Sequence, residues 1–263
     1  MLRRDCLKLA GLALPALPAR PAAGAATFPT TIAPSATLAF RTPGKNPNGL
    51  QATSEGLWVL DQGTNRVALL RYSDGGVIRE FATETDRGSG ITFDGSALWI
   101  ASTYNSRLVK LDAQTGKTIK EYRCPGSGVV KWGPRGAHPH PTGAHGMEWK
   151  YRQLWVAVPP AATIYVIDPE GGGVIRSFPA PGVRPHGIGW DADGSLWCTE
   201  SIHRSFFKLD PKTGQILRQV MLPLTAPEVD GLVIEPHGMS IWEGKFWFSC
   251  AETGEVYNLP IPS

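Results

Sequence analysis

Two residue types that can do acid–base chemistry occur together in the stretch "PHGIGWDADGSLWCTESIHR", residues 185–204. Its central part, "GIGWDADGSLW", has the alternation and the Asp/Gly turn of a β-hairpin. Folding the chain about that turn places His186 opposite Glu200, and directly opposed residues have Cβ atoms about 5 Å apart. A carboxylate can orient an imidazole and make it a general base, or both can ligate a divalent cation. The stretch therefore predicts a site at His186 and Glu200, with His203 in the following loop.

The elements that must position this pair are repeated along the chain. "LW" or "FW" recurs, with spacings of 41, 56, 42 and 50 residues, at Trp58, Trp99, Trp155, Trp197 and Trp247. Each pair follows a glycine-led segment, and tight Asp/Gly turns separate further short strands. Four short strands repeating at about 40 residues are typical of propeller blades. The sequence predicts an all-β protein, a single β-propeller of four-stranded antiparallel blades over residues 27–263. Five blades are counted, and six is the alternative.

The two ends of the repeat region predict how the ring closes. "AFRTPGKNPNGL" (39–50) has the same Phe-to-Gly spacing as "EFATETDRGSGI" (80–91), so residues 36–42 correspond to a fourth strand without a blade before it. The last repeat, 237–262, has only three strands. We expect the N-terminal strand to complete the last blade, which leaves no exposed sheet edge. Two insertions, at about 125–143 and 222–236, connect blades on the face away from the Asp/Gly turns.

All six histidines map to that insertion-bearing face. His145, His186 and His237 each begin the first strand of a blade, where blades one and two carry Asn48 and Ser89. We expect these positions to line the mouth of the central channel. His138 and His140 lie in the first insertion with Trp132, which is expected to face a ligand. The alternative is that such a polar ring only holds ordered water and seals the channel.

The first 26 residues, "MLRRDCLKLAGLALPALPARPAAGAA", predict a twin-arginine export signal, and hence a periplasmic or secreted protein. They carry four basic residues and one acidic residue, so the rest of a chain of net charge +3 is near neutral. No basic stripe indicates nucleic acid, and no later segment is long enough to span a membrane. We expect a monomer. Cys124, Cys198 and Cys250 remain, which allows one disulfide and a free thiol without fixing the pairing.

The stretch "PHGIGWDADGSLWCTE" resembles the virginiamycin B lyase (streptogramin lyase) family of propellers, best over residues 184–214. The resemblance implies a magnesium-dependent carbon–oxygen lyase that opens a cyclic depsipeptide at its ester by elimination. His186 corresponds to the first histidine of the family and Glu200 to its glutamate. The second family histidine lies two residues later, where this chain has Ile202, and His203 follows. The family's ring has seven blades, against five counted here.

The predicted function is therefore that of an exported, lyase-like propeller. A divalent cation, magnesium by the resemblance, would be held by Glu200, His145 and His237 and would polarise an ester or lactone carbonyl. His186 or His203 would remove the adjacent proton, and Glu200 would position the base or the metal. The alternative is a non-catalytic propeller that binds a peptide, a glycan or a partner protein at the channel mouth.

Overall fold

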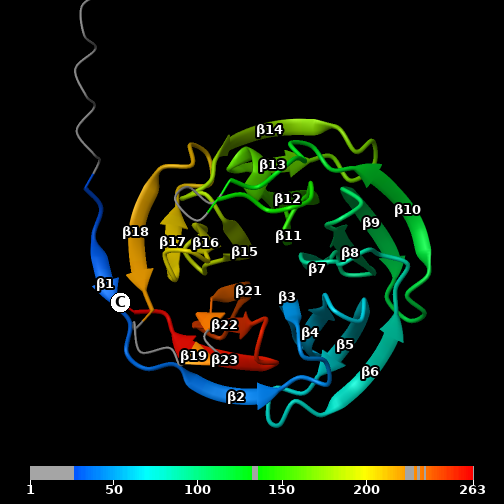
Figure 1. Cartoon of the computed structure of the whole chain (residues 1–263), viewed down its shortest axis with the longest axis horizontal. Helices are drawn as coiled ribbons and strands as arrows, with labels where there is room; N and C mark the ends of the chain where they lie inside the picture. The colour runs from blue at the N-terminus through cyan, green and yellow to red at the C-terminus, as the bar shows by residue number, and fades with distance from the viewer. Residues whose placement is uncertain (1–26, 132–135, 223–227, 230–231, 234, 263) are drawn as a thin grey trace, which may run out of the picture.

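The chain forms a ring of five blades around a central channel, as the repeats predict. The structure is a computed structural model that describes residues 27–131, 136–222, 228–229, 232–233 and 235–262. Figure 1 looks down the channel, with the first strand of each blade innermost and the fourth at the rim. The predicted export signal lies outside the described residues and stays a prediction. Within them, no helix is long and apolar enough to cross a membrane.

Blades one to four each contain four antiparallel strands in chain order from the channel outward. Blade one comprises β3 (Pro47–Thr53), β4 (Gly56–Asp61), β5 (Arg66–Leu70) and β6 (Val77–Ala82). Blade two comprises β7 (Ile91–Phe93), β8 (Ala97–Ser102), β9 (Arg107–Asp112) and β10 (Thr118–Arg123). Blade three comprises β11 (Gly146–Lys150), β12 (Gln153–Val158), β13 (Thr163–Ile167) and β14 (Val174–Pro179), with the 3-10 helix η2 (Pro159–Ala161) between β12 and β13. Blade four comprises β15 (Pro185–Trp190), β16 (Leu196–Glu200), β17 (Ser205–Leu209) and β18 (Ile216–Met221).

Blade five confirms the predicted closure of the ring. Its inner strands are β21 (Pro236–Trp242), β22 (Lys245–Cys250) and β23 (Glu255–Pro260), and its outer strand is β2 (Thr37–Arg41) from the N-terminus. β2 pairs antiparallel with β23. The sequence did not predict β1 (Thr30–Ile32), which adds a parallel fifth strand to the outer edge of blade four by pairing with β18.

The hydrophobic core lies between the blades. Five separate clusters of buried side chains each join two consecutive blades, as where Trp197 of blade four packs with Phe246 of blade five. The repeated tryptophans of the second strands supply a large part of this buried surface. In blade four the indole Nε1–H of Trp197 also donates to Asp191 of the hairpin turn, at 2.9 Å. Cys124, Cys198 and Cys250 are buried free thiols, so the disulfide that the sequence allowed does not form.

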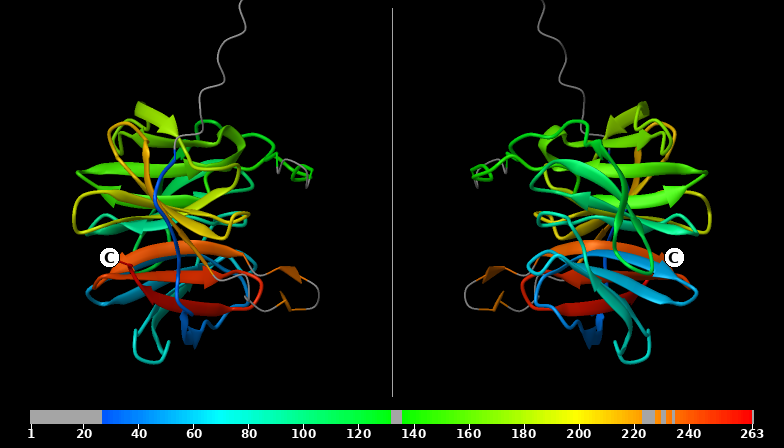
Figure 2. Two further views of the ribbon diagram at one scale, coloured as in Figure 1. Left: turned by 90° about the vertical axis from the view of Figure 1, so that its left-hand side faces the viewer. Right: turned by 90° about the vertical axis from the view of Figure 1, so that its right-hand side faces the viewer.

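The two insertions project from the same side of the disc, as Figure 2 shows in both views. The second contains a small hairpin of β19 (Glu228–Val229) and β20 (Leu232–Val233). The insertions leave the blades where the fourth strand connects to the next first strand. This is the face that the sequence predicts to carry the site.

Candidate functional site

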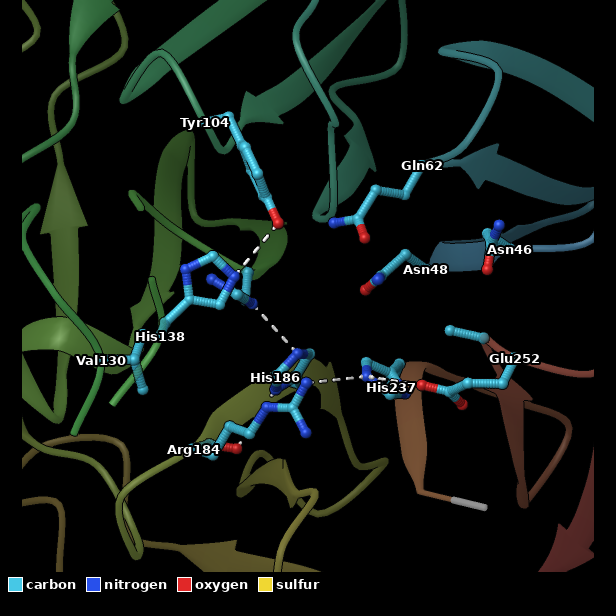
Figure 3. Close-up of a pocket in the computed structure, with 12 residues that line it drawn as sticks. Asn46, Asn48, Gln62, Tyr104, Val130, His138, Arg184, His186, His237 and Glu252 are labelled. Atoms are coloured by element: carbon cyan, nitrogen blue, oxygen red, sulfur yellow. Dashed lines mark hydrogen bonds and ion pairs between the residues drawn. The ribbon is translucent and has the colours of Figure 1, made fainter. Parts of the chain in front are cut away.

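A polar cavity, which we call the cup, occupies the insertion-bearing mouth of the channel (Figure 3). Its volume is about 120 Å³. Its walls and floor come from all five blades and the first insertion, and consist of Asn46, Asn48, Gln62, Tyr104, Val130, His138, His145, Arg184, His186, His237, Ala251 and Glu252. Nearly all of these side chains can donate or accept a hydrogen bond, so the cup suits a small polar group.

The floor of the cup is the predicted ring of first-strand residues. The rings of His145 and His186 have centroids 4.6 Å apart, and those of His186 and His237 are 4.7 Å apart. Asn48 continues the ring, and Ser89 Oγ lies 2.6 Å from Asn48 Oδ1. Of the residues predicted to line the mouth, Ser89 alone among those described lies below the cup lining.

A glycine follows each floor residue and closes the channel beneath the cup. A Cβ atom on Gly146 would lie 1.9 Å from the carbonyl oxygen of His186, and one on Gly187 would lie 2.2 Å from Met239 N. Only glycine lets the backbones of neighbouring first strands approach this closely. The cup is therefore a dead end and not the entrance to an open pore.

A β-bulge at the start of the first strand accompanies two of the floor histidines, His186 and His237. In blade four the pairing shifts between Pro185 and Ile188, and the same shift occurs in blades one and five. A bulge adds one residue to a strand and re-aims its side chains. This extra residue makes one sequence prediction wrong: Glu200 pairs with Pro185 and not with His186.

The floor imidazoles are neutral and their tautomers are fixed. His186 Nδ1 lies 3.2 Å from the carbonyl oxygen of Arg184, which can only accept, so Nδ1 carries the hydrogen. His186 Nε2 then accepts from His145 Nδ1–H at 3.0 Å, and His145 Nε2 accepts from the Thr142 hydroxyl at 3.2 Å. Burial lowers the pKa of both imidazoles well below the usual value, and the Arg184 charge lowers it further. The pair thus forms a rigid, uncharged floor.

The tautomer of His237 is fixed in the same way, beside the guanidinium of Arg184. Its Nδ1–H donates to the carbonyl oxygen of Glu235 at 2.9 Å, so Nε2 is left to accept from Arg184 Nη2 at 3.3 Å. Burial and the Arg184 charge lower the pKa of His237 to about 3. The Arg184 guanidinium itself forms a charge-assisted hydrogen bond with the buried Glu235 carboxylate. A cation and a neutral imidazole therefore form one wall of the cup, and the Glu235 counter-ion holds the cation in place.

Glu200 does not face the cup; it binds backbone. Oε1 accepts the N–H groups of Val183 and Arg184, at 3.1 and 2.7 Å, and Oε2 accepts that of His203 at 2.6 Å. The carboxylate is fully buried and joins the loop before β15 to the loop after β16. The His203 side chain is 56% exposed, with Nδ1 3.5 Å from Glu200 Oε2. The structure thus places Glu200 behind Arg184, and His203 outside the cup.

Two cup residues that the sequence reasoning missed occupy one position of the repeat. Tyr104 and Glu252 each lie two residues beyond the end of the second strand, where blade four has Ile202. Glu252 is 35% exposed, with Oε1 3.9 Å from His237 Nε2. Burial raises the pKa of the Glu252 carboxyl, and the Arg184 charge opposes that rise. Aligning the blades on their tryptophans would have found both residues, since this position also holds the family's second histidine.

Arg184, two residues before His186, is a further cup residue that the sequence analysis did not predict. Arg184, Glu235 and Asn46 each stand two residues before a floor residue, in the triplets "RPH", "EPH" and "NPN". Arg184 and Asn46 line the cup, and Glu235 holds Arg184. The repeated X-Pro motif was the available signal.

The first insertion adds His138 to the rim. Its Nε2 lies 3.1 Å from the Tyr104 hydroxyl (Figure 3). Its Nδ1 lies 2.7 Å from the carbonyl oxygen of His140. His138 lines the cup, whereas His140 is exposed beside it. Trp132 lies outside the described residues.

The side chains predicted to hold magnesium do not fit a divalent cation. Both Glu200 oxygens are taken by backbone N–H groups, and the Nε2 atoms of His145 and His237 accept hydrogen bonds from Thr142 and Arg184. A guanidinium inside the donor set also repels a cation. Among the described residues, no group of three or more His, Cys, Asp or Glu side chains could hold a metal ion.

Solved structures align with most of this chain at low sequence identity. No protein-family model matches the chain. Glutaminyl cyclase from Myxococcus xanthus aligns with a TM-score of 0.67 and 10% identity, covering 88% of this chain and 95% of that one. Virginiamycin B lyase from Staphylococcus aureus aligns with a TM-score of 0.49 and 22% identity, covering 82% of this chain and 66% of the lyase. A streptogramin B lyase has a TM-score of 0.49 and 18% identity, covering 84% and 95%. The chain is thus similar to these lyases, as the sequence predicted. The likeness to the cyclase shows the propeller fold.

Proposed function

We propose that this propeller is an acid–base enzyme of the carbon–oxygen lyase type, with the cup as its active site. One observation carries the proposal: a partly buried carboxyl, Glu252, shares a closed polar cup with the Arg184 guanidinium. Burial raises the pKa of Glu252, which brings the carboxyl closer to neutral pH, where a general base is most effective. The resemblance of residues 184–214 supplies the class of reaction.

In the proposed reaction Glu252 removes a proton from a carbon of the cyclic substrate that lies between an activating carbonyl and the carbon that bears the ester oxygen. The electrons of that C–H bond form a carbon–carbon double bond, and the adjacent C–O bond of the ester breaks. The ester oxygen leaves as a carboxylate, so the ring opens without consuming water. Glu252 retains the proton and releases it to solvent.

Arg184 stabilises the negative charge that develops on the carbonyl oxygen. Its guanidinium is fixed before the reaction by Glu235 and His237, so no reorganisation is needed as the charge forms. A carboxylate base opposite hydrogen-bond donors is an established way to remove a proton next to a carbonyl. The neutral floor imidazoles of His145 and His186 would hold polar atoms of the substrate. No step requires a metal ion.

The second candidate is a binding module, which the size of the cup favours. A volume of about 120 Å³ admits one small side chain or terminal group. A peptide, a glycan or a partner protein could insert such a group and rest against the insertions.

The test is turnover of cyclic depsipeptides and lactones by the purified protein, followed by mass spectrometry. Elimination leaves the mass of the substrate unchanged, whereas hydrolysis adds one water. Glu252→Gln should lower turnover by a factor of about 100 or more, because it removes the base and keeps the shape of the side chain. Glu55→Gln, an exposed glutamate of the β3–β4 turn, is the matched control and should keep full turnover.

Three other outcomes would count against the proposed enzyme, favour the binding module or reinstate a metal ion. Full turnover in Glu252→Gln would contradict the proposed base. Absence of turnover, together with saturable calorimetric binding of a peptide or glycan that Arg184→Gln abolishes, would favour the binding module. Turnover that chelation with EDTA abolishes would restore the catalytic metal.

A further inference from the structure

A second polar ring lies on the channel axis below the cup. It occupies the position three residues beyond the floor residue in each first strand, and consists of Gln51, Thr92, Glu148, Gly189 and Ser240. All four members other than the glycine are buried: their exposed fractions are 8% for Gln51, 0% for Thr92, 7% for Glu148 and 1% for Ser240. Three residues of strand span roughly 10 Å, and the glycine constriction separates this ring from the cup.

Side-chain oxygens from three neighbouring blades converge in this ring. Thr92 Oγ1 lies 2.5 Å from Gln51 Oε1 and 3.4 Å from Glu148 Oε1, but the hydroxyl has one hydrogen. The Gln51 amide donates to its neighbour, the Ala52 carbonyl, at 3.1 Å. Glu148 Oε1 also accepts the N–H of Trp149 at 3.1 Å. Three oxygens of neighbouring blades thus converge, and the side-chain donors that face Glu148 are the Thr92 hydroxyl and the Gln51 amide.

The ring also contains one buried carboxyl without a paired cation inside it. A buried carboxylate must be paired, must bind a metal ion or must take up a proton. Burial raises the pKa of the Glu148 carboxyl to about 7, and the ammonium of Lys150 opposes that rise only through its long-range charge. Ser240 offers no positive charge, and its Oγ already accepts the N–H of Ala52 at 3.0 Å.

We propose that Gln51, Thr92 and Glu148 bind a hard cation on the channel axis. Carbonyl, hydroxyl and carboxylate oxygens are the donors that such cations prefer, and the ring has no imidazole or sulfur ligand. One carboxylate balances the charge of a sodium ion, and would hold calcium weakly. The ion would join blades one, two and three, so its role is structural and independent of the chemistry in the cup.

Thermal unfolding of the full chain at matched ionic strength tests this site. The buffers contain sodium, calcium or choline chloride, since choline is too large to enter the ring. The unfolding midpoint should be higher in sodium or in calcium than in choline by about 3 °C, because an ion that binds only the folded state stabilises it. Whichever salt gives the shift identifies the ion.

Glu148→Gln should remove this difference and Thr92→Val should reduce it, whereas Glu55→Gln should keep it. Equal midpoints of the wild-type protein in all three salts would overturn the proposal, and so would a salt shift that persists in Glu148→Gln. Equilibrium dialysis against calcium, read by elemental analysis, gives a second measurement that does not depend on how stable the variants are. Turnover enters neither measurement, so this proposal and the proposed function can fail separately.

Discussion

Blades one and four use an acidic residue in the same place and carry different chemistry around it. Asp61 ends the second strand of blade one, and Glu200 ends that of blade four. Each carboxylate accepts a hydrogen bond from a backbone N–H in the loop before its own blade. Asn46 N–H donates to Asp61 and Arg184 N–H donates to Glu200, both at 2.7 Å. Blade one makes the same contact although the residues that it presents to the cup are amides. We infer that Glu200, like Asp61, acts as a support for the loop before its blade.

The difference between the two blades lies in what those loops present to the cup. Blade one presents Asn46 and Asn48, which are amides that cannot change charge at ordinary pH. Blade four presents Arg184 and His186 from the same two positions. The shared support therefore lets the cup change its chemistry by substitution at the loop residues alone.

The largest effect should come from removing the support. Glu200→Ala leaves three backbone N–H groups without their acceptor, which should lower the free energy of unfolding by about 3 kcal/mol. Asp61→Ala removes the acceptor of two backbone N–H groups and of the exposed Thr64 hydroxyl, which can turn to solvent, so it should lower the free energy of unfolding by about 2 kcal/mol. Urea denaturation followed by tryptophan fluorescence measures both.

Turnover separates the support from a catalytic role in these variants. Under the proposed function Asp61→Ala keeps most of the activity, and Glu200→Ala loses it by displacing Arg184. Glu200→Gln retains an acceptor for the loop and should recover a large part of the activity. If Glu200→Gln is as stable as wild type and yet inactive, then Glu200 takes part in the chemistry and the comparison with Asp61 fails.

A smaller effect should appear in acid, where the two blades differ in charge. The pKa of His186 is lowered in the folded protein, so the unfolded chain binds its proton first as the pH falls below about 6.5. The free energy of unfolding should therefore decrease between pH 6.5 and pH 4, by as much as about 1.4 kcal/mol per pH unit for each such histidine. The variant His186→Asn, which carries the blade-one residue, should lose the contribution of one histidine to the dependence of the free energy of unfolding on pH.

The measurement is a series of urea midpoints from pH 4.5 to 7.5. His140→Asn, an exposed histidine of the first insertion, is the control and should leave the slope unchanged. The slope is compared, and not the stability at one pH, because His186→Asn also removes the hydrogen bond to His145. An unchanged slope in His186→Asn would show that the imidazole titrates normally in the folded protein.

The sequence predicted the frame of the molecule well because the frame depends on repeated local signals. The turns, the tryptophans and the glycine-led first strands recur, and a fault in one repeat is corrected by the others. The closure through residues 36–42 followed from counting strands. By contrast, β1 has no counterpart in the repeat and forms only through three residues of parallel pairing, so no pattern could indicate it.

The site was predicted in part, and the errors have a common physical origin. The floor histidines were placed correctly because each begins a strand next to an obligatory glycine. The pairing of His186 with Glu200 was wrong because a β-bulge, which leaves no local sign in the sequence, shifts the register by one residue. Arg184 and Glu252 lie in loops, where side-chain direction follows from contacts between blades and not from periodicity.

The smallest effect should come from His203, the residue nearest to the second histidine of the lyase family. Blade one has Thr64 at the matching position, and its backbone N–H donates to Asp61 at 2.8 Å as that of His203 donates to Glu200. His203→Thr keeps this backbone contact and removes a largely exposed side chain. The free energy of unfolding should therefore change by no more than about 0.5 kcal/mol. Turnover, measured beside Glu252→Gln, should stay within about a factor of two of wild type, because the imidazole lies outside the cup. A tenfold loss of turnover at unchanged stability would instead assign His203 the chemistry of the family's second histidine, and blade four would then differ from blade one in its outer loop as well as in its floor.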